Sequence, residues 1–113
     1  MAAGRRSVIW TESARAALDD VVTYIAPESR EAALRVLAAA LDTASSLDQF
    51  ADRGRVVPEL NQPDLRELFV FDYRLVYRVR PEEVIVVAYV HGARDFATWR
   101  EEESRRTGDE GLL

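Results

Sequence analysis

The spacing of hydrophobic residues changes near residue 65, and this change narrows the possible folds more than any other feature of the sequence. Between residues 12 and 47, apolar side chains recur at the period of an amphipathic helix. Three short runs rich in β-branched and aromatic residues follow, at 65–71, 73–80 and 83–91. Helices followed by an antiparallel sheet predict an α+β fold.

Two helices are predicted, because each helical stretch starts after a residue that caps helices well. Thr11 precedes the first helix, from about residue 12 to residue 25, and Pro27 ends it. Ser29 precedes the second, and its predicted apolar stripe consists of Leu34, Leu37, Leu41 and Ala44, with Leu47 near its end. Neither helix can bury its stripe alone, so we expect a two-helix hairpin packed on one face of the sheet.

The chain has the length of one domain, and no linker or repeat divides residues 1–113. The run Ser7–Trp10 is predicted to be a first strand, which gives the order β-α-α-β-β-β. We expect the core to extend over about residues 7–99, with Phe96 and Trp99 anchoring a short last helix. Residues 102–113 are mostly polar and charged and are expected to form a frayed tail.

The composition excludes several classes of function. The chain has no cysteine and one histidine, His91, so it cannot build a zinc site of the usual kind. Carboxylates leave a magnesium site open, but no pattern points to one, and we expect no metal and no cofactor. No apolar run is long enough to span a membrane and no signal peptide is recognisable, so we expect a cytoplasmic protein. The net charge of −5 disfavours binding of nucleic acid through the overall field, although a local arginine patch could still bind it.

Side chains alternate between the two faces of a strand, and this alternation gathers arginines on one face. Within 73–80, Arg74 and Arg78 lie opposite the apolar and tyrosine positions that should meet the helices. A turn at Asp72 would place Arg66 directly across from Arg78. A turn at residues 80–83 would add Tyr89 and His91, whereas a slip of one residue would turn both inward. The predicted open face therefore carries Arg66, Arg74, Arg78, Tyr89 and His91, with Arg94 just beyond the strand end.

Structural roles compete with binding roles at each of these positions. The arginines could form a solvated strand face with salt bridges to Glu12, Glu59 or Glu67. His91 could bond the backbone of a turn, and Tyr89 could be half-buried packing. The pattern of residue types leaves both interpretations open.

Four pieces of the sequence together resemble the RelE/ParE superfamily of type II toxins, and they lie nearer its ParE branch. They are Gly54-Arg55-x-Val57-Pro58-Glu59-Leu60, Leu65-Arg66-Glu67-Leu68, Tyr73-Arg74-Leu75-Val76-Tyr77-Arg78-Val79 and His91-Gly92-Ala93-Arg94-Asp95. The resemblance covers about residues 8–96. It implies a compact toxin fold, a cognate antitoxin that wraps the toxin with a helix and an extended segment, and operator DNA bound only through that antitoxin.

The resemblance also implies two different targets. ParE-type members poison DNA gyrase by binding it, whereas RelE-type members cut messenger RNA on the ribosome. For a RelE-like nuclease, the resemblance would assign catalytic roles to Arg74, His91 and Arg94, with Trp99 or Arg100 near the place of a catalytic tyrosine. The chain lacks the lysines typical of those nucleases, and its net charge suits ribosomal RNA poorly.

The sequence therefore predicts a toxin that inhibits DNA gyrase by protein binding. A ribosome-dependent mRNA endoribonuclease is the first alternative, and an interaction module without toxicity is the second. Under the main prediction no residue is catalytic, and the sequence does not identify the residues that bind the antitoxin.

Overall fold

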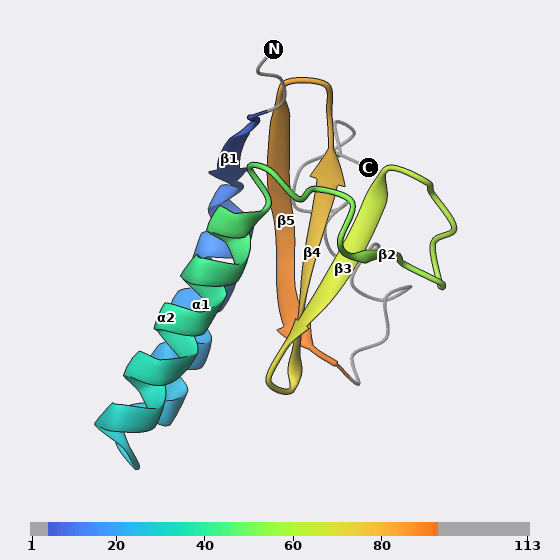
Figure 1. The fold of residues 1–113 in the computed structure, drawn as a ribbon. Helices are drawn as coiled ribbons and strands as arrows, with labels where there is room; N and C mark the ends of the chain where they lie inside the picture. The colour runs from blue at the N-terminus through green and yellow to red at the C-terminus, as the bar shows by residue number, and fades with distance from the viewer. Residues whose placement is uncertain (1–4, 93–113) are drawn as a thin grey trace.

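The computed structural model describes residues 5–92, and within them the predicted order of helices and strands is confirmed, with one short strand, β2, added after the helices (Figure 1). The elements are β1 (Ser7–Trp10), α1 (Glu12–Ile25), α2 (Arg30–Ser46), β2 (Arg55–Val56), β3 (Leu65–Val70), β4 (Tyr73–Val79) and β5 (Glu83–His91). The predicted last helix at Phe96 and Trp99 and the frayed tail at 102–113 lie outside the described residues. The extent of the single domain stays a prediction.

The sheet is mixed rather than purely antiparallel. Its strand order is β1-β5-β4-β3-β2, and the pairs formed by β2, β3, β4 and β5 are antiparallel. β1 instead runs parallel to β5, with Ser7 opposite Glu83 and Trp10 opposite Val86. The two helices lie between these strands in sequence, so the chain reaches β5 through a long crossover rather than a hairpin, and such crossovers permit parallel pairing.

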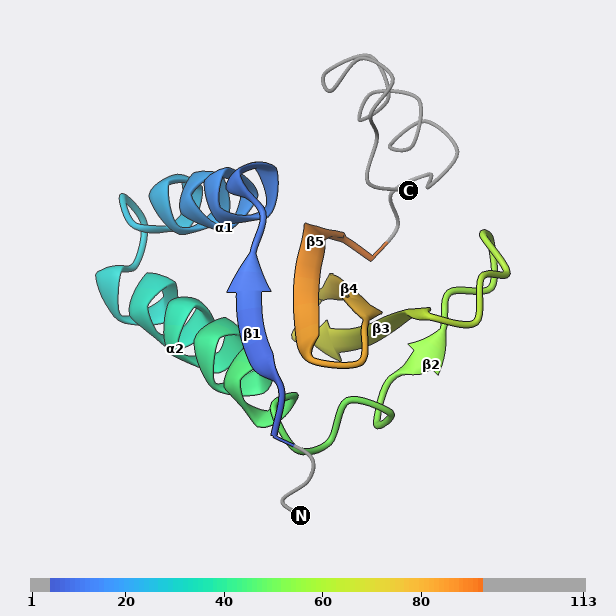
Figure 2. The same ribbon diagram turned by 90° about the horizontal axis from the view of Figure 1, so that it is seen from above.

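The helices pack together on one face of the sheet, which we call the helix face (Figure 2). Thr11 and Ser29 cap them as predicted, because each side-chain oxygen accepts a hydrogen bond from a backbone N–H three residues later, at 3.1 and 3.0 Å. The core beneath them contains Ala14, Leu18, Ala40, Ala44, Leu47, Val70, Leu75, Tyr77, Val84, Val86 and Tyr89. Neither α1 nor α2 is long and apolar enough to cross a membrane.

The predicted apolar stripe of α2 is partly wrong. The buried positions are Ala33, Val36, Ala40 and Ala44, followed by Leu47. Leu34 is 54% exposed and Leu41 is 45% exposed, while Leu37 is half-buried. The helix is apolar on nearly every side, and its alanine stripe is the one that allows close approach to the sheet and α1.

The strands β3 and β4 are joined by a two-residue turn, Phe71 and Asp72. Val70 is therefore opposite Tyr73, and Arg66 is opposite Tyr77 rather than opposite Arg78. Directly paired residues share a face, so Arg66 belongs to the helix face.

A β-bulge changes the register between β4 and β5. Near the turn Val79 pairs with Val84 and Tyr77 with Val86, as a turn at 80–83 predicts. Beyond them Val76 pairs with Ala88, so Val87 is an extra residue on β5. The bulge shifts all later pairs by one position, and Tyr89 and His91 consequently lie on the helix face.

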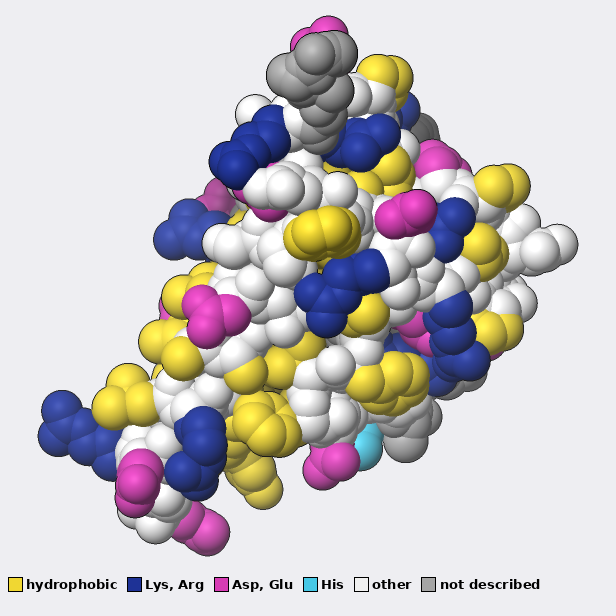
Figure 3. Space-filling view, viewed as in Figure 1, with side chains coloured by type: hydrophobic (Ala, Val, Ile, Leu, Met, Phe, Trp, Pro, Cys, Tyr) yellow, Lys and Arg dark blue, Asp and Glu magenta, His cyan; other side chains and the backbone are white. Residues whose placement is uncertain are grey.

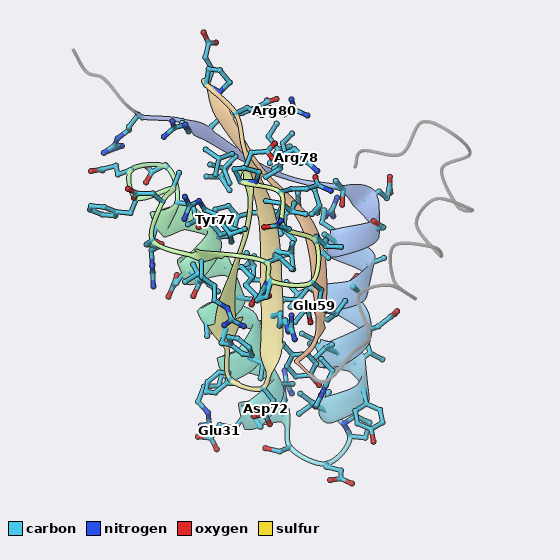
Figure 4. All side chains as sticks on the ribbon, turned by 90° about the vertical axis from the view of Figure 1, so that its right-hand side faces the viewer. Glu31, Glu59, Asp72, Tyr77, Arg78 and Arg80 are labelled. Atoms are coloured by element: carbon cyan, nitrogen blue, oxygen red, sulfur yellow. The ribbon has the colours of Figure 1, made fainter. Side chains whose placement is uncertain are left out.

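The opposite side of the sheet, which we call the loop face, has a smaller core of its own. Leu65, Val76, Val87, Ala88 and Val90 are buried there together with Val57. Val57 and the partly buried Leu60 belong to the segment at residues 57–64 that joins β2 to β3. We call residues 57–64 the covering loop, because Figure 4 shows this segment, with Glu59, in front of the strands.

Candidate functional site

The two arginines of β4 share the loop face, as predicted, but they are buried rather than open. Arg74 is 9% exposed and Arg78 is 7% exposed. The Arg74 guanidinium forms a two-pronged ion pair with Glu59 of the covering loop, at 3.2 Å from Nη1 to Oε1 and 3.1 Å from Nη2 to Oε2. Its Nε donates to the carbonyl of Gly92 at 3.1 Å. Arg74 is therefore bound by groups of the chain itself.

A second carboxylate beneath Arg74 extends this ion pair into a network. The side chain of Glu67 is fully buried, and its two oxygens accept from Arg74 Nη1 at 3.0 Å and from Arg55 Nε at 2.7 Å. The order Arg55, Glu67, Arg74, Glu59 alternates positive and negative charge. Burial of Glu67 and Arg74 is tolerable because each has opposite charges at hydrogen-bond distance.

Arg78 is bound in the same manner at the other end of the covering loop. Its Nη1 donates to Asp64 and its Nη2 donates to Gln62 at 3.3 Å. Two carboxylates from the covering loop thus bind two buried guanidinium groups of β4. Of the structural alternatives considered from the sequence, salt bridges to Glu59 and Glu67 are the ones observed for Arg74.

These contacts change the acidity of the groups involved. The hydrogen bond from Arg74 lowers the pKa of the Glu59 carboxyl below its ordinary value. Burial acts to raise the pKa of Asp64, but the hydrogen bond and the charge of Arg78 outweigh it, and the net pKa is lowered. Burial acts to lower the pKa of Arg74, and Glu59 and Glu67 together raise it instead. All three shifts favour the charged forms that keep the covering loop bound.

The predicted open face is wrong for three of its six members. Arg66, Tyr89 and His91 lie on the helix face, because of the two-residue turn and the bulge. Tyr89 is buried and stacks on Tyr73, with 5.3 Å between ring centroids, and burial raises its pKa to about 12. His91 meets the edge of Tyr73 at 5.4 Å. The sixth predicted member, Arg94, lies outside the described residues.

The register also separates residues that the nuclease alternative, considered from the sequence, would combine. Arg74 pairs with Val90 on the loop face, whereas His91 pairs with Tyr73 on the helix face. Within residues 5–92, the tyrosines of the strands, Tyr73, Tyr77 and Tyr89, all belong to the helix face as well. No group of three or more acidic or histidine residues in the same part of the chain could hold a metal ion.

Tyr77 and Gly54 bind the loop after α2 to the sheet, a role that the sequence prediction missed. The Tyr77 hydroxyl donates to the carbonyl of Ala51 at 2.8 Å and accepts from the N–H of Gly54 at 2.9 Å. A methyl group on Gly54 would lie 2.5 Å from Tyr77 Oη and 2.6 Å from the carbonyl oxygen of Glu67. Both residues belong to the sequence pieces that carry the family resemblance. The sequence shows that a glycine and a tyrosine stand there, but it does not show that they are in contact.

The fold, a helix hairpin on a five-stranded mixed sheet, and a family match over residues 8–96 together define a class of protein, the small toxins of the RelE/ParE superfamily. The family model described as ParE toxin of type II toxin-antitoxin system, parDE, matches residues 8–96, and the chain belongs to this family. The membership predicted from the sequence is therefore confirmed.

The solved structures agree at the level of the fold. The chain is similar to a chain of the structure described as the chromosomal ParDE TA system from P. aeruginosa, with a TM-score of 0.65 and 23% identity. The similarity covers 77% of this chain and 96% of that chain. No curated protein matches the chain.

Proposed function

We propose that this type II toxin inhibits DNA gyrase by binding to it in the cytoplasm. Membership in the ParE family supports the proposal, since the ParE-type members of the superfamily are the gyrase poisons. The chemistry of the loop face supports it further. A toxin that acts by protein binding needs a shaped and rigid surface, but it needs no free acid, base or cation for bond cleavage.

The observation that carries the proposal is the internal pairing of Arg74. Cleavage of RNA needs a base, an acid and cations that face the developing phosphorane charge. The guanidinium of Arg74 faces Glu59 and Glu67, and His91 belongs to the other face of the sheet. An RNA phosphate would have to displace a two-pronged carboxylate from a buried arginine, which makes binding to gyrase the better supported function.

We propose further that a cognate antitoxin neutralises the toxin and that the pair contacts operator DNA through the antitoxin. The similarity to a chain of a ParDE TA system supports such a partner. Two surfaces suit the known modes of peptide docking. Leu34 and Leu41 form an exposed apolar stripe on α2, and β2 pairs only with Arg66 and Glu67, which leaves the outer edge of β3 from Leu68 onward for strand addition.

The deciding experiment adds purified toxin to a gyrase supercoiling assay and, in parallel, to a ribosome-dependent mRNA cleavage assay. We expect loss of supercoiling at micromolar toxin, no cleavage of mRNA, and relief of inhibition by the antitoxin encoded beside the toxin. Induced expression should produce filamentous cells and a DNA-damage response. Inhibition of translation with intact supercoiling would support the ribosomal alternative, and no effect in either assay would support the interaction module.

His91 gives a sharper test of the nuclease alternative. It is exposed at the end of β5, so replacement by alanine should leave the core intact. We expect His91→Ala to retain full toxicity and full inhibition of gyrase. A large loss of toxicity with unchanged thermal unfolding would favour an acid–base role for this histidine.

A further inference from the structure

Arg6 and Arg66 differ from the buried arginines of the loop face, because neither forms an ion pair with a carboxylate of residues 5–92. Within residues 5–92, Arg5, Arg55, Arg74 and Arg78 each lie within 4 Å of an acidic side chain. The guanidinium contacts of Arg6 and Arg66 in that part of the chain are with backbone carbonyls only. A carbonyl orients a guanidinium group without cancelling its charge.

Hydrogen bonds to backbone carbonyls orient both guanidinium groups. Arg6 Nε donates to the carbonyl of Arg80 at 2.8 Å. Arg66 Nη1 donates to the carbonyl of Gly54 at 2.6 Å, and Gly54 is itself fixed by Tyr77. Each arginine keeps further N–H groups that the described part of the chain does not use. Both side chains are half-buried, so a charged partner would lose little additional entropy on binding them.

The two arginines line the same open pocket, of about 450 Å³, at the end of the sheet where β4 finishes. The other polar side chains around it are Gln49, Asp52 and Asp64, and the last of these is already bound to Arg78. In the view of Figure 3, arginine, acidic and hydrophobic side chains are interleaved over the upper part of the molecule, and Figure 4 shows Arg78 and Arg80 at the same end of the sheet.

We propose that this pocket binds one carboxylate side chain, an aspartate or a glutamate, presented by a partner protein. Two oriented guanidinium groups that line one pocket offer positive charge and N–H donors to the planar oxygens of a carboxylate. Asp52 and Asp64 on the rim and the net charge of −5 repel any anion, but the repulsion grows with the number of charges, so a single carboxylate is a better occupant than a phosphate chain with a charge on every unit. The proposal that this partner is gyrase rests on the proposed function.

The first test measures the pocket without any partner protein. The side-chain Nε–Hε signals of Arg6 and Arg66 would be followed by NMR while N-acetyl-glutamate amide is added up to about 50 mM, the range for weak binding of a small ligand. We expect both signals to shift and saturate, and the matching glutamine compound to leave them unchanged. Equal shifts with both compounds, or no shift with glutamate, would overturn the proposal.

The second test asks whether gyrase uses the pocket. Glutamine removes the charge at both positions. At position 6 its amide nitrogen takes the place of Nε and can still donate to the carbonyl of Arg80, whereas at position 66 it ends two bonds short of the Nη1 that donates to Gly54. We expect the double variant Arg6→Gln/Arg66→Gln to bind gyrase at least about tenfold more weakly, because hydrogen bonds between charged groups are the strong ones. Arg35→Gln on the exposed side of α2 is the matched control, and Asp52→Asn should tighten binding.

The outcomes separate this proposal from the proposed function. If the parent protein inhibits gyrase and the double variant inhibits it equally well, the pocket is not the gyrase site, although the proposed function stands. If the parent protein does not inhibit gyrase, the proposed function fails, and the NMR titration still decides whether the pocket binds a carboxylate.

Discussion

At the scale of single residues, Glu67 is the most consequential side chain of the loop face. Its side chain is fully buried and forms one ion pair with the buried Arg74 and a second with Arg55, which is mostly exposed. Removal of one partner from a buried ion pair leaves an uncompensated charge, and this costs about 3–5 kcal/mol. The network therefore stabilises the fold only as long as it is complete.

We predict that Glu67→Gln lowers the free energy of unfolding by about 3 kcal/mol. Arg55→Gln should lower it by less than about 1 kcal/mol, because the Arg55 side chain is mostly exposed and Glu67 keeps its bond to Arg74. Urea unfolding monitored by circular dichroism measures both values. Similar losses for the two variants would contradict the central position of Glu67.

We predict that acid weakens the attachment of the covering loop. The folded-state pKa of Glu59 is lowered from its ordinary 4.5, so its contribution to stability is full above pH 4.5 and is lost as the pH falls through the lowered value. Asp64 acts in the same direction from its ordinary 3.8. Urea midpoints measured from about pH 6 to pH 3 should fall less steeply for Glu59→Gln than for the parent.

At the scale of elements, the turn between β3 and β4 contains a strained residue. Phe71 has φ = 57°, a backbone region that costs residues with a side chain about 1–2 kcal/mol and costs glycine nothing. Phe71 is 59% exposed, so little packing is lost on its removal. The turn is tight because Val70 and Tyr73 are directly paired.

We therefore predict that Phe71→Gly is more stable than Phe71→Ala by about 1 kcal/mol, against the usual order of these residues in strands. Thermal unfolding of the two variants, which differ by one methyl group, measures this difference. A more stable alanine variant would mean that the positive φ is not retained in solution.

The elements could be predicted from the sequence, but their exact pairing could not. The helices are capped by Thr11 and Ser29, and the three long strands follow the β-rich runs. The bulge at Val87 leaves no local signal, because residues 84–90 are apolar on both faces and alternation is invisible there. The face on which Arg66 lies depends on the two-residue turn between β3 and β4. An error of one residue in the predicted register moves its side chain to the other face of the sheet.

The candidate site was predictable to a similar extent. The shared face of Arg74 and Arg78 follows from strand periodicity alone. Their partners Glu59 and Asp64 come from a loop whose path is set by tertiary contacts of Val57 and Leu60, and no period in the sequence encodes that path. Arg6 is distant from Arg66 in sequence, so only the folded chain brings them to one pocket.

At the scale of the whole molecule, Gly54 connects the two sides of the sheet. It meets Tyr77, whose ring is in the helix-face core, and the backbone of Glu67, whose side chain is in the loop-face network. We predict that Gly54→Ala lowers the free energy of unfolding by at least about 2 kcal/mol and reduces toxicity, because backbone at 2.6 Å cannot yield as a flexible side chain would.

Tyr77→Phe serves as the companion variant for Gly54. It removes one close atom but not the carbonyl of Glu67, so the double variant Gly54→Ala/Tyr77→Phe should not regain the stability of Tyr77→Phe. Differential scanning calorimetry compares the four proteins. Recovery in the double variant would locate the clash at the tyrosine alone.

The parallel pairing of β1 with β5 has a consequence for how the protein is made. Ser7 is opposite Glu83, so β1, the first of the described elements to be synthesised, has its partner in β5, the last of them. Such distant pairing gives a high contact order and slow closure of the chain. The sheet of the described residues therefore stays incomplete until β5 has been synthesised, and until then β1 has no neighbouring strand with which to pair.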